Sequence, residues 1–410
     1  MHVCLLTAGR PSEVIVGGEE RFTISLGKWL LSQGHKVTIV SRKLFGVEVV
    51  EEPCDISTPN SYDKKNTIRR LQLPYPVFIL AMLSTSMLLA LSIISLNRKL
   101  KISIIHAQDT GYGGLAAIVA AKLLRIPVVL SSHGVRYYTV GNALKGSAAA
   151  LCLPWEYWLD LFTSRFANIV VNVSSVGEKF FSVAIKKNKM RTIPIGIETS
   201  DFRADEEVGQ TVRKNLGIQD DVLLGFVGRL APEKNLFTLL DAFLEASNQA
   251  KKMKLLIVGT GPLESKLKSF SHDRGLDGKV VFTGVRSDVN RLLAALDIFL
   301  LPSFTEGCPT SLLEAMASEN AIIASDIPSI REIVSSDNEA ILVNPHDAEE
   351  LEQAILKLYS NPKRRKELGR KAKNRAKQYD INIVNNEILE LYKNLVAPRQ
   401  ISPRKKDSFS

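Results

Sequence analysis

The chain has 410 residues, of which 45% are hydrophobic and 23% are charged. This composition is ordinary for a globular protein and excludes a chain that is largely disordered. Lysine and arginine together number 53 against 43 acidic residues, a net charge of +10 that favours phosphates, anionic lipid or nucleic acid as partners. We expect no nucleic-acid partner, because the chain lacks a helix-turn-helix pattern, zinc-finger spacing and a basic strand with aromatic residues.

The four cysteines lie far apart in the sequence and include no CxxC pair: Cys4, Cys54, Cys152 and Cys308. This scatter predicts neither a disulfide framework nor a zinc site, and it is typical of a reducing cytosol. Met1–Thr7 lacks the basic flank and long apolar run of a signal peptide, so we expect a core strand there.

In the first half of the chain, short apolar runs alternate with helical patterns. The first run is His2–Thr7, and the helix predicted over Glu19–Gln33 ends before Gly34, a residue type common just past a helix end. The later elements are strands at Lys36–Ser41, Ser103–Ala107, Val128–His133 and Ile169–Ser174, and helices at Tyr112–Arg125 and Trp155–Ala167.

The segment Val77–Leu96 carries no charge and lies between arginine and lysine residues. About 20 apolar residues are enough to span a bilayer. However, five serine and threonine side chains reduce its hydrophobicity, and a spanning helix would split one parallel sheet across the membrane. We therefore expect a buried or interfacial helix rather than a transmembrane span.

The second half repeats the alternation and ends in helices from Ala348 to Val396. Such a rhythm predicts parallel sheets with helices on both faces. The predicted strands are Leu223–Leu230, Lys254–Gly259, Lys279–Thr283, Ile298–Pro302 and Ala321–Ser325, and the helices between them are Leu236–Ala246, Leu263–Arg274, Val289–Ala295 and Thr310–Ser318.

A charged, non-periodic stretch near Pro194–Glu206 marks the boundary between the two halves. We expect one domain over residues 1–195 and a second over residues 196–380. A terminal helical segment, 381–397, and a disordered basic tail, 398–410, follow them.

Glycine and histidine follow strands in the first half. Gly17 and Gly18 come between the first strand and the first helix, where a backbone can approach a phosphate or sugar closely, although a structural turn explains them equally well. The region has no GxGxxG. His133 ends a strand and could face a reacting group in the crevice, where ligands of parallel sheets bind; the alternative is a structural histidine.

Two cations follow the first strand of the second half. Arg229 comes at the strand end and Lys234 five residues later, just before a helix. Together they can neutralise a diphosphate, and arginine can hold two oxygens at once. The alternative for Arg229 is a surface salt bridge with Glu233.

The segment Glu306-Gly-Cys-Pro-Thr-Ser-Leu-Leu-Glu314 carries the sharpest signal. Pro309 suits the first turn of a helix, whose exposed amides bind anions. Glu306 precedes that helix and can bond sugar hydroxyls, whereas Glu314 lies one turn inside it and can accept from ribose hydroxyls. For Glu314 the alternative is pairing with the helix dipole.

No Asp-x-Asp occurs in the chain, and no cluster has metal-ligand spacing. We therefore expect no metal ion and no further cofactor. In their place, Arg229, Lys234 and the helix at Pro309 would stabilise a diphosphate.

These motifs together resemble the retaining glycosyltransferases of family 4, which have the GT-B fold, over about Met1 to Leu395. The family's Glu-x7-Glu motif corresponds to Glu306 and Glu314, and its Gly-Arg-Leu…Glu-Lys segment to Gly228–Lys234. Further matches are Gly17–Gly18, Gly34–His35, His133-Gly134, Ile195-Gly-Ile-Glu198 and Val258-Gly-Thr-Gly-Pro262. The resemblance implies two Rossmann-like parallel-sheet domains facing a central cleft, with the final helix crossing back onto the first domain.

The resemblance also implies roles for single residues. Arg229 and Lys234 would bind the donor diphosphate, Glu306 the transferred sugar and Glu314 the ribose, with His133 beside the reacting centre. The residues expected to line the donor site are Gly17, Gly18, Arg229, Lys234, Gly307, Pro309, Thr310, Ser311, Leu312 and Glu314. Two departures, Ile327-Pro-Ser329 in place of glycines and Cys308 in place of phenylalanine, affect sugar or base preference.

The expected reaction is a metal-independent hexosyl transfer from a nucleoside diphosphate sugar, with attack on the face that the phosphate leaves. The acceptor would be a saccharide or a lipid-linked precursor, as in polysaccharide, lipopolysaccharide or glycolipid biosynthesis. The protein would be cytoplasmic, with peripheral or monotopic contact to an anionic inner membrane face. Two alternatives stay open: a GT-B sugar-nucleotide epimerase and a non-catalytic membrane-associated scaffold.

Overall fold

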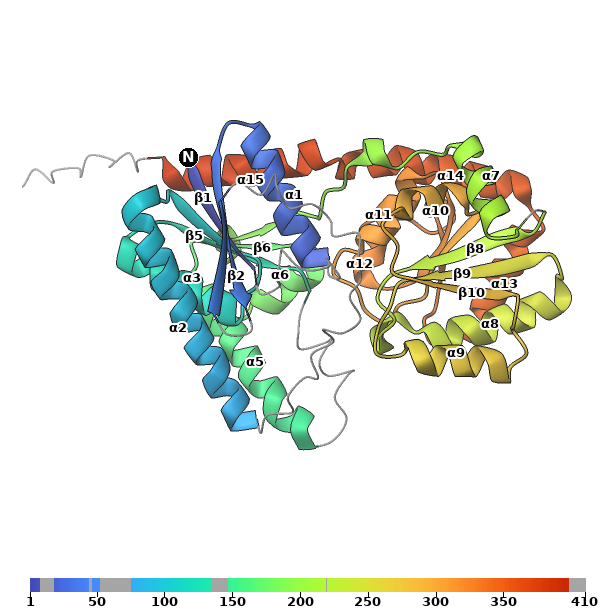
Figure 1. Ribbon diagram of the computed structural model, residues 1–410, viewed down its shortest axis with the longest axis horizontal. Helices are drawn as coiled ribbons and strands as arrows, with labels where there is room; N and C mark the ends of the chain where they lie inside the picture. Colours follow the sequence, from blue (N-terminus) through green and yellow to red (C-terminus); the bar gives the residue numbers. More distant parts are fainter. Residues whose placement is uncertain (8–17, 44–45, 52–74, 135–146, 219, 398–410) are drawn as a thin grey trace, which may run out of the picture.

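The computed structural model describes residues 1–7, 18–43, 46–51, 75–134, 147–218 and 220–397. Two sheets lie side by side, and helices cover both faces of each (Figure 1). The first sheet is built from residues on the N-terminal side of residue 195 and the second from residues beyond it. The GT-B arrangement predicted from the sequence is therefore confirmed, while the exact domain boundary stays a prediction.

The first sheet has seven strands in the order β3-β2-β1-β4-β5-β6-β7. Six run parallel, but β3 pairs antiparallel with β2 at one edge, which the expectation of a parallel sheet missed. The edge strands escaped prediction because they are short or lack a continuous apolar run. The strands are β1 (His2–Thr7), β2 (Lys36–Lys43), β3 (Gly46–Glu51), β4 (Ile104–Ala107), β5 (Val128–Ser132), β6 (Ile169–Asn172) and β7 (Met190–Thr192).

The helices around this sheet are α1 (Gly18–Ser32), α2 (Tyr75–Leu100), α3 (Tyr112–Leu124), α5 (Ser147–Phe166) and α6 (Ser175–Phe181). Gly34 follows α1 with φ of +78°, a conformation that favours glycine. Helix α5 begins well before Trp155, where the sequence pattern predicted its start. Pro154 lies inside the helix rather than before it. Helix α2 covers the charge-free segment, and only part of it is buried.

The second sheet has six parallel strands in the order β10-β9-β8-β11-β12-β13. Its strands are β8 (Val222–Val227), β9 (Met253–Val258), β10 (Val280–Gly284), β11 (Ile298–Leu301), β12 (Ala321–Ser325) and β13 (Ile341–Val343). Its helices are α7 (Glu206–Asn215), α8 (Leu236–Gln249), α9 (Glu264–Asp273), α10 (Val289–Ala295), α11 (Thr310–Ala317), α12 (Pro328–Arg331), α13 (Ala348–Tyr359) and α14 (Pro362–Ala376). The strand order reverses between β8 and β11, and ligands of such sheets bind where the order reverses.

The last helix, α15 (Ile381–Val396), leaves the second domain and packs against the first (Figure 1). The indole of Trp29 donates to Asn382 Oδ1 at 2.9 Å. Tyr392 is fully buried, and its hydroxyl lies 2.5 Å from Nδ1 of His106, whose Nε2 is 2.7 Å from the Ser131 hydroxyl. Burial lowers the pKa of His106 to about 3, so a neutral ring joins α15 to β4 and β5.

We expect Tyr392→Phe to lower the free energy of unfolding by about 1–3 kcal/mol, because it leaves a buried ring nitrogen of His106 without its partner. Denaturant unfolding at neutral pH measures the change. Tyr359→Phe on α13 is the matched control and should change stability little. Equal effects of the two substitutions would show that the bond to His106 contributes nothing.

Candidate active site

A cavity of about 610 Å³ lies at the carboxyl ends of the second sheet, where they meet the first domain. Its walls come from the segments after β8, β9, β10 and β11, from the first turn of α1 and from His133. A smaller cavity of about 170 Å³ shares His133, Lys234, Glu306 and Gly307 with it and continues along Val173–Gly177. The two cavities therefore meet at the boundary between the domains.

The cation Lys234 lies deep in this cavity. The 3₁₀ turn Pro232–Lys234 carries it, and the amide of Phe304 donates to the carbonyl of Glu233 at 2.9 Å, which ties this turn to the loop after β11. Lys234 Nζ lies 2.6 Å from Glu306 Oε1, which also accepts from the Ser303 hydroxyl at 2.7 Å. The Glu306 side chain is only 7% exposed. A cation and an anion that are both largely buried thus share one wall.

Arg229 follows β8 and pairs with Glu233 at 2.8 Å, with 48% of its side chain exposed. The salt bridge that the sequence offered as the alternative interpretation is therefore formed. It does not exclude a ligand role, because the Arg229 side chain also lines the cavity and an exposed ion pair holds its partners weakly.

Helix α11 begins in the cavity wall. Pro309, Thr310 and Ser311 line the cavity, so the positive end of the helix dipole lies beside it. One turn further, Glu314 is buried and lies 3.6 Å from Arg21 Nη1 of α1. Burial raises the pKa of Glu314, and Arg21 opposes that rise. An ion pair between Arg21 and Glu314 therefore joins the two domains across the cavity.

His133 comes directly after β5, and its Nε2 lies 2.9 Å from Gln108 Oε1. Its ring contacts Phe22 edge-on, with 5.2 Å between the centroids. Within the part of the chain that the structure describes, Nδ1 is buried without a hydrogen-bond partner. Burial lowers the pKa of His133 to about 4, so the ring is neutral at physiological pH.

Gly307 brings the domains into close contact. A Cβ at this position would lie 2.3 Å from the carbonyl oxygen of His133 and 3.3 Å from Val173 Cγ2. Any larger residue would therefore collide with the backbone of the opposite domain. The neighbouring Cys308 is buried, which raises the pKa of its thiol to about 12 and makes it a poor nucleophile.

The structure collects most of the predicted site residues in one place: His133, Arg229, Lys234, Glu306, Gly307, Pro309, Thr310, Ser311 and Glu314. Leu312 is an exception, because its side chain lies in the hydrophobic core and its amide donates to the Pro309 carbonyl at 3.1 Å. Gly18 starts α1, and Gly17 lies outside the described residues.

Sequence reasoning missed two groups that line the cavity and one residue that contacts His133 from outside it. Glu19, Glu20 and Arg21 form the first turn of α1, and Arg286 follows β10, where it pairs with Asp288 at 2.7 Å. Gln108 beside His133 follows β4. The position of Arg286 and Gln108 just after strands was a usable signal, but only the tertiary structure brings Arg21 to Glu314.

Among the described residues, no group of three or more His, Cys, Asp or Glu side chains is arranged to hold a metal ion. The cavity instead combines four cations, Arg21, Arg229, Lys234 and Arg286, with a helix N-terminus and largely buried carboxylates. Such a set can bind an anion next to a polyhydroxylated group.

Two family profiles match the chain. The profile described as Glycosyl transferases group 1 matches residues 209–375, and the profile of Glycosyltransferase Family 4 matches residues 16–201. Together they cover both domains.

Relatives and solved structures agree with these matches. TuaC of Bacillus subtilis, a candidate teichuronic acid biosynthesis glycosyltransferase, is 31% identical over 63% of this chain and 62% of that protein. UDP-Gal:alpha-D-GlcNAc-diphosphoundecaprenol alpha-1,3-galactosyltransferase of Escherichia coli is 26% identical over 65% of this chain and 69% of that protein. The structure of Anabaena HepE in complex with UDP-glucose has a TM-score of 0.74 at 19% identity, covering 96% of this chain and all of that one, so the fold is shared.

We expect Gly307→Ala to move the domains apart or to disorder the loop, because the added carbon meets a backbone oxygen of the opposite domain. Small-angle scattering and the free energy of unfolding measure the change. Thr305→Ala in the same loop, which only removes atoms, should leave both unchanged. An unaltered radius of gyration and unaltered stability in Gly307→Ala would contradict the close contact.

The low pKa values of His133 and His106 predict a pH dependence of stability. In the folded protein the pKa of His133 is about 4 and that of His106 is about 3, whereas a histidine in the unfolded chain has a pKa of about 6.5. The unfolded state therefore binds more protons, and the free energy of unfolding should fall as the pH decreases from 6.5 towards 4. Denaturant unfolding along this range should show a shallower slope for His133→Gln than for the unchanged chain; identical slopes would place the His133 pKa near its usual value.

Proposed function

Because the chain belongs to the group 1 glycosyltransferases of family 4, whose members use nucleotide-sugar donors, we propose that it transfers a sugar from a UDP-sugar to a hydroxyl of a lipid-linked saccharide acceptor. The transfer retains the anomeric configuration, as is general in this family, and needs no metal ion. UDP is favoured by the donor named for the Escherichia coli relative, and the lipid-linked acceptor by that relative's diphosphoundecaprenol substrate.

One observation carries the proposal: Lys234, Arg229 and the N-terminus of α11 line a single cavity that also contains Glu306 and His133. The positive groups surround a space for a diphosphate, and the carboxylate of Glu306 can accept from sugar hydroxyls beside it. Glu314, buried one turn into α11, can accept from the ribose. The arrangement fits each part of a nucleoside diphosphate sugar with a group of matching chemistry.

The charges that line the cavity are paired within the protein. Lys234 bonds Glu306 and Arg229 bonds Glu233, so a diphosphate gains these cations by exchange of partners rather than by desolvating free ones. Once the donor is bound, cations held at the diphosphate can stabilise the negative charge that develops as it leaves.

In the proposed reaction, the bond between the anomeric carbon and the diphosphate oxygen breaks, and UDP leaves with the electron pair. The acceptor oxygen bonds the same face of the anomeric carbon, and its proton passes to the leaving phosphate. Lys234 and Arg229 stabilise the negative charge on the diphosphate, and Glu306 orients the sugar. His133, neutral at physiological pH, accepts or donates a hydrogen bond beside the sugar without adding a competing positive charge.

We expect UDP, at about a hundredfold excess over its Kd, to stabilise the protein by about 2.7 kcal/mol, with EDTA making no difference. Arg229→Ala should weaken UDP binding roughly 10- to 100-fold, because a charge-assisted hydrogen bond is lost. Calorimetric titration and thermal unfolding with UDP, GDP and ADP measure both effects. With a UDP-sugar and a lipid-diphosphate saccharide, NMR of the product should show the donor's anomeric configuration.

Arg274→Ala is the matched control, because Arg274 also pairs with a carboxylate, Asp241, at similar exposure but outside the cavity. It should bind UDP normally. Binding of NAD alone, or no nucleotide binding, would exclude the proposal. Release of UDP without any acceptor, together with an epimerised sugar, would assign the epimerase reaction instead.

A further inference from the structure

Helix α2 presents an apolar face to solvent. Its stretch Ile79–Leu100 is long and apolar enough to cross a membrane, yet only 22% of its most apolar part is buried. One side, which includes Leu89 and Ile93, packs into the first domain's core. The other side carries large exposed hydrophobic residues at helical spacing, Leu80 (65% exposed), Met87, Leu88 and Leu91.

Helix α5 presents a second exposed face, and this one is aromatic. Trp155, Trp158 (66% exposed), Phe162 and Phe166 recur at intervals of three and four residues, so they share one side of the helix. The side of α5 that carries Asp160, Thr163 and Ser164 is buried.

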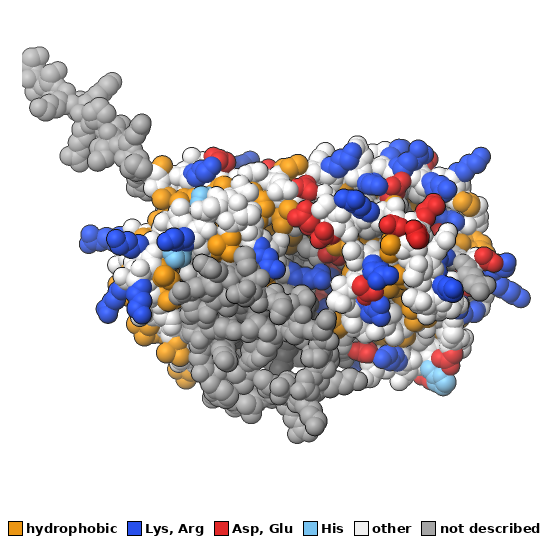
Figure 2. Space-filling view, turned by 45° about the horizontal axis from the view of Figure 1, so that its top comes forward, with side chains coloured by type: hydrophobic (Ala, Val, Ile, Leu, Met, Phe, Trp, Pro, Cys, Tyr) orange, Lys and Arg blue, Asp and Glu red, His pale blue; other side chains and the backbone are white. Residues whose placement is uncertain are grey.

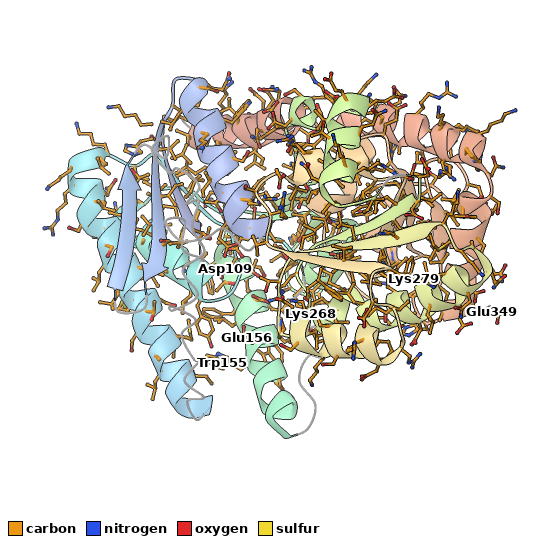
Figure 3. The ribbon with its side chains drawn as sticks, turned by 45° about the vertical axis from the view of Figure 1, so that its right-hand side comes forward. Asp109, Trp155, Glu156, Lys268, Lys279 and Glu349 are labelled. Carbon is orange, nitrogen blue, oxygen red and sulfur yellow. The ribbon has the colours of Figure 1, made fainter. Side chains whose placement is uncertain are left out.

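The two helices are joined to the same residue of α3. Ser86 of α2 donates to the carbonyl of Tyr112 at 2.9 Å, and the indole of Trp155 donates to the hydroxyl of the same tyrosine at 2.9 Å. Both helices thus flank the start of α3, and their N-terminal ends extend beyond the sheet in the same direction (Figure 1). Trp155 lies on the side of α5 that faces α2 (Figure 3). We call the exposed residues Leu80, Met87, Leu88, Leu91, Trp155, Trp158 and Phe162 the apolar tip.

Cations follow the apolar tip along each helix. Arg98 lies seven residues beyond Leu91 on α2, and Arg165 seven residues beyond Trp158 on α5, about 10 Å in each case at 1.5 Å per residue. Helices α2 and α3 contain no acidic residue. Lys and Arg side chains gather at the edge of the first domain that α2 and α3 form, beside hydrophobic patches (Figure 2). We call these the basic collar: Arg98, Lys99, Lys101, Lys122, Arg125 and Arg165.

We propose that the apolar tip inserts into the surface of an anionic lipid bilayer while the basic collar contacts lipid phosphates. An apolar face that enters the headgroup boundary by about 5–10 Å, with lysine and arginine beside it, is what an interfacial helix requires. Exposed tryptophan suits the membrane–water interface. The collar supplies positive charge that is complementary to anionic lipid.

Insertion of the tip leaves α2 packed on the domain. A spanning α2 would remove Leu89, Ala90 and Ile93 from the core and separate β1 from its neighbour β4 across the membrane. Interfacial contact needs no such rearrangement. The inference does not depend on the identity of the donor or acceptor, and it would place the first domain at the surface where a lipid-linked acceptor is found.

The test uses the full chain and vesicles of phosphatidylcholine, with or without phosphatidylglycerol. We expect sedimentation with the phosphatidylglycerol vesicles at low salt, and at least about tenfold weaker binding at high salt or to phosphatidylcholine alone. The triple substitution Leu91→Ser, Trp158→Ser and Phe162→Ser should weaken binding at least about tenfold. The double substitution Arg98→Glu and Lys99→Glu should also weaken binding at least about tenfold, but only to the anionic vesicles.

The control substitutions are Val183→Ser and Ile383→Ser, which change exposed hydrophobic residues outside the tip and should bind like the unchanged chain. The free energy of unfolding verifies that each variant is folded, and titration with UDP separates failure of this inference from failure of the proposed function. A chain that stays in the supernatant at low salt overturns the inference. The inference is also overturned if the tip variant binds vesicles as strongly as the unchanged chain, or if the protein is a dimer that the tip substitutions dissociate.

Discussion

The relative position of the two sheets depends on one crossing point, where the chain leaves the first domain and later returns to it. The amide of Ile197 donates to the Tyr379 carbonyl at 2.9 Å, and the amide of Ile381 donates to the Ile197 carbonyl at 2.8 Å. A Cβ at Gly196 would lie 3.0 Å from the Cα of Ile381. Any side chain at position 196 would therefore press on Ile381 and Val384 and force the two segments slightly apart. From this point α15 extends onto the first domain and anchors there through Tyr392 and Trp29.

That geometry explains why the cavity contains paired charges rather than isolated ones. The carboxyl ends of β8 and β11 deliver Arg229, Lys234 and Glu306 to one wall, and α1 brings Arg21 to Glu314 from the opposite domain. A buried charge without a partner is costly, so each buried member has an ion of opposite sign nearby. The same pairs can change partners when an anionic ligand enters, and the contact at Gly307 keeps His133 close to them.

The first domain combines two surfaces of different chemistry. One is the polar cavity wall around His133, which burial keeps neutral, and the other is the apolar tip with its basic collar. Both surfaces are fixed to α3 and the adjoining strands. Tyr112 accepts hydrogen bonds from α2 and from α5, and Asp109 at the end of β4 accepts from the amide of Gly113 at 3.1 Å. A rigid connection of this kind would hold the cavity at a constant height above a membrane surface.

Much of this protein was determined by local sequence. Hydrophobic runs and helical spacing depend on neighbouring residues, so the strands β1, β8 and β11 and the positions of Arg229 and Glu306 at their ends were predictable. The tertiary structure alone decided which distant residues meet: Arg21 with Glu314, His133 with Gln108, and Gly307 with the His133 backbone. It also decided that β3 runs antiparallel and that Leu312 faces the core. These contacts join segments far apart in the chain, and no local pattern encodes the angle and distance at which two folded layers pack.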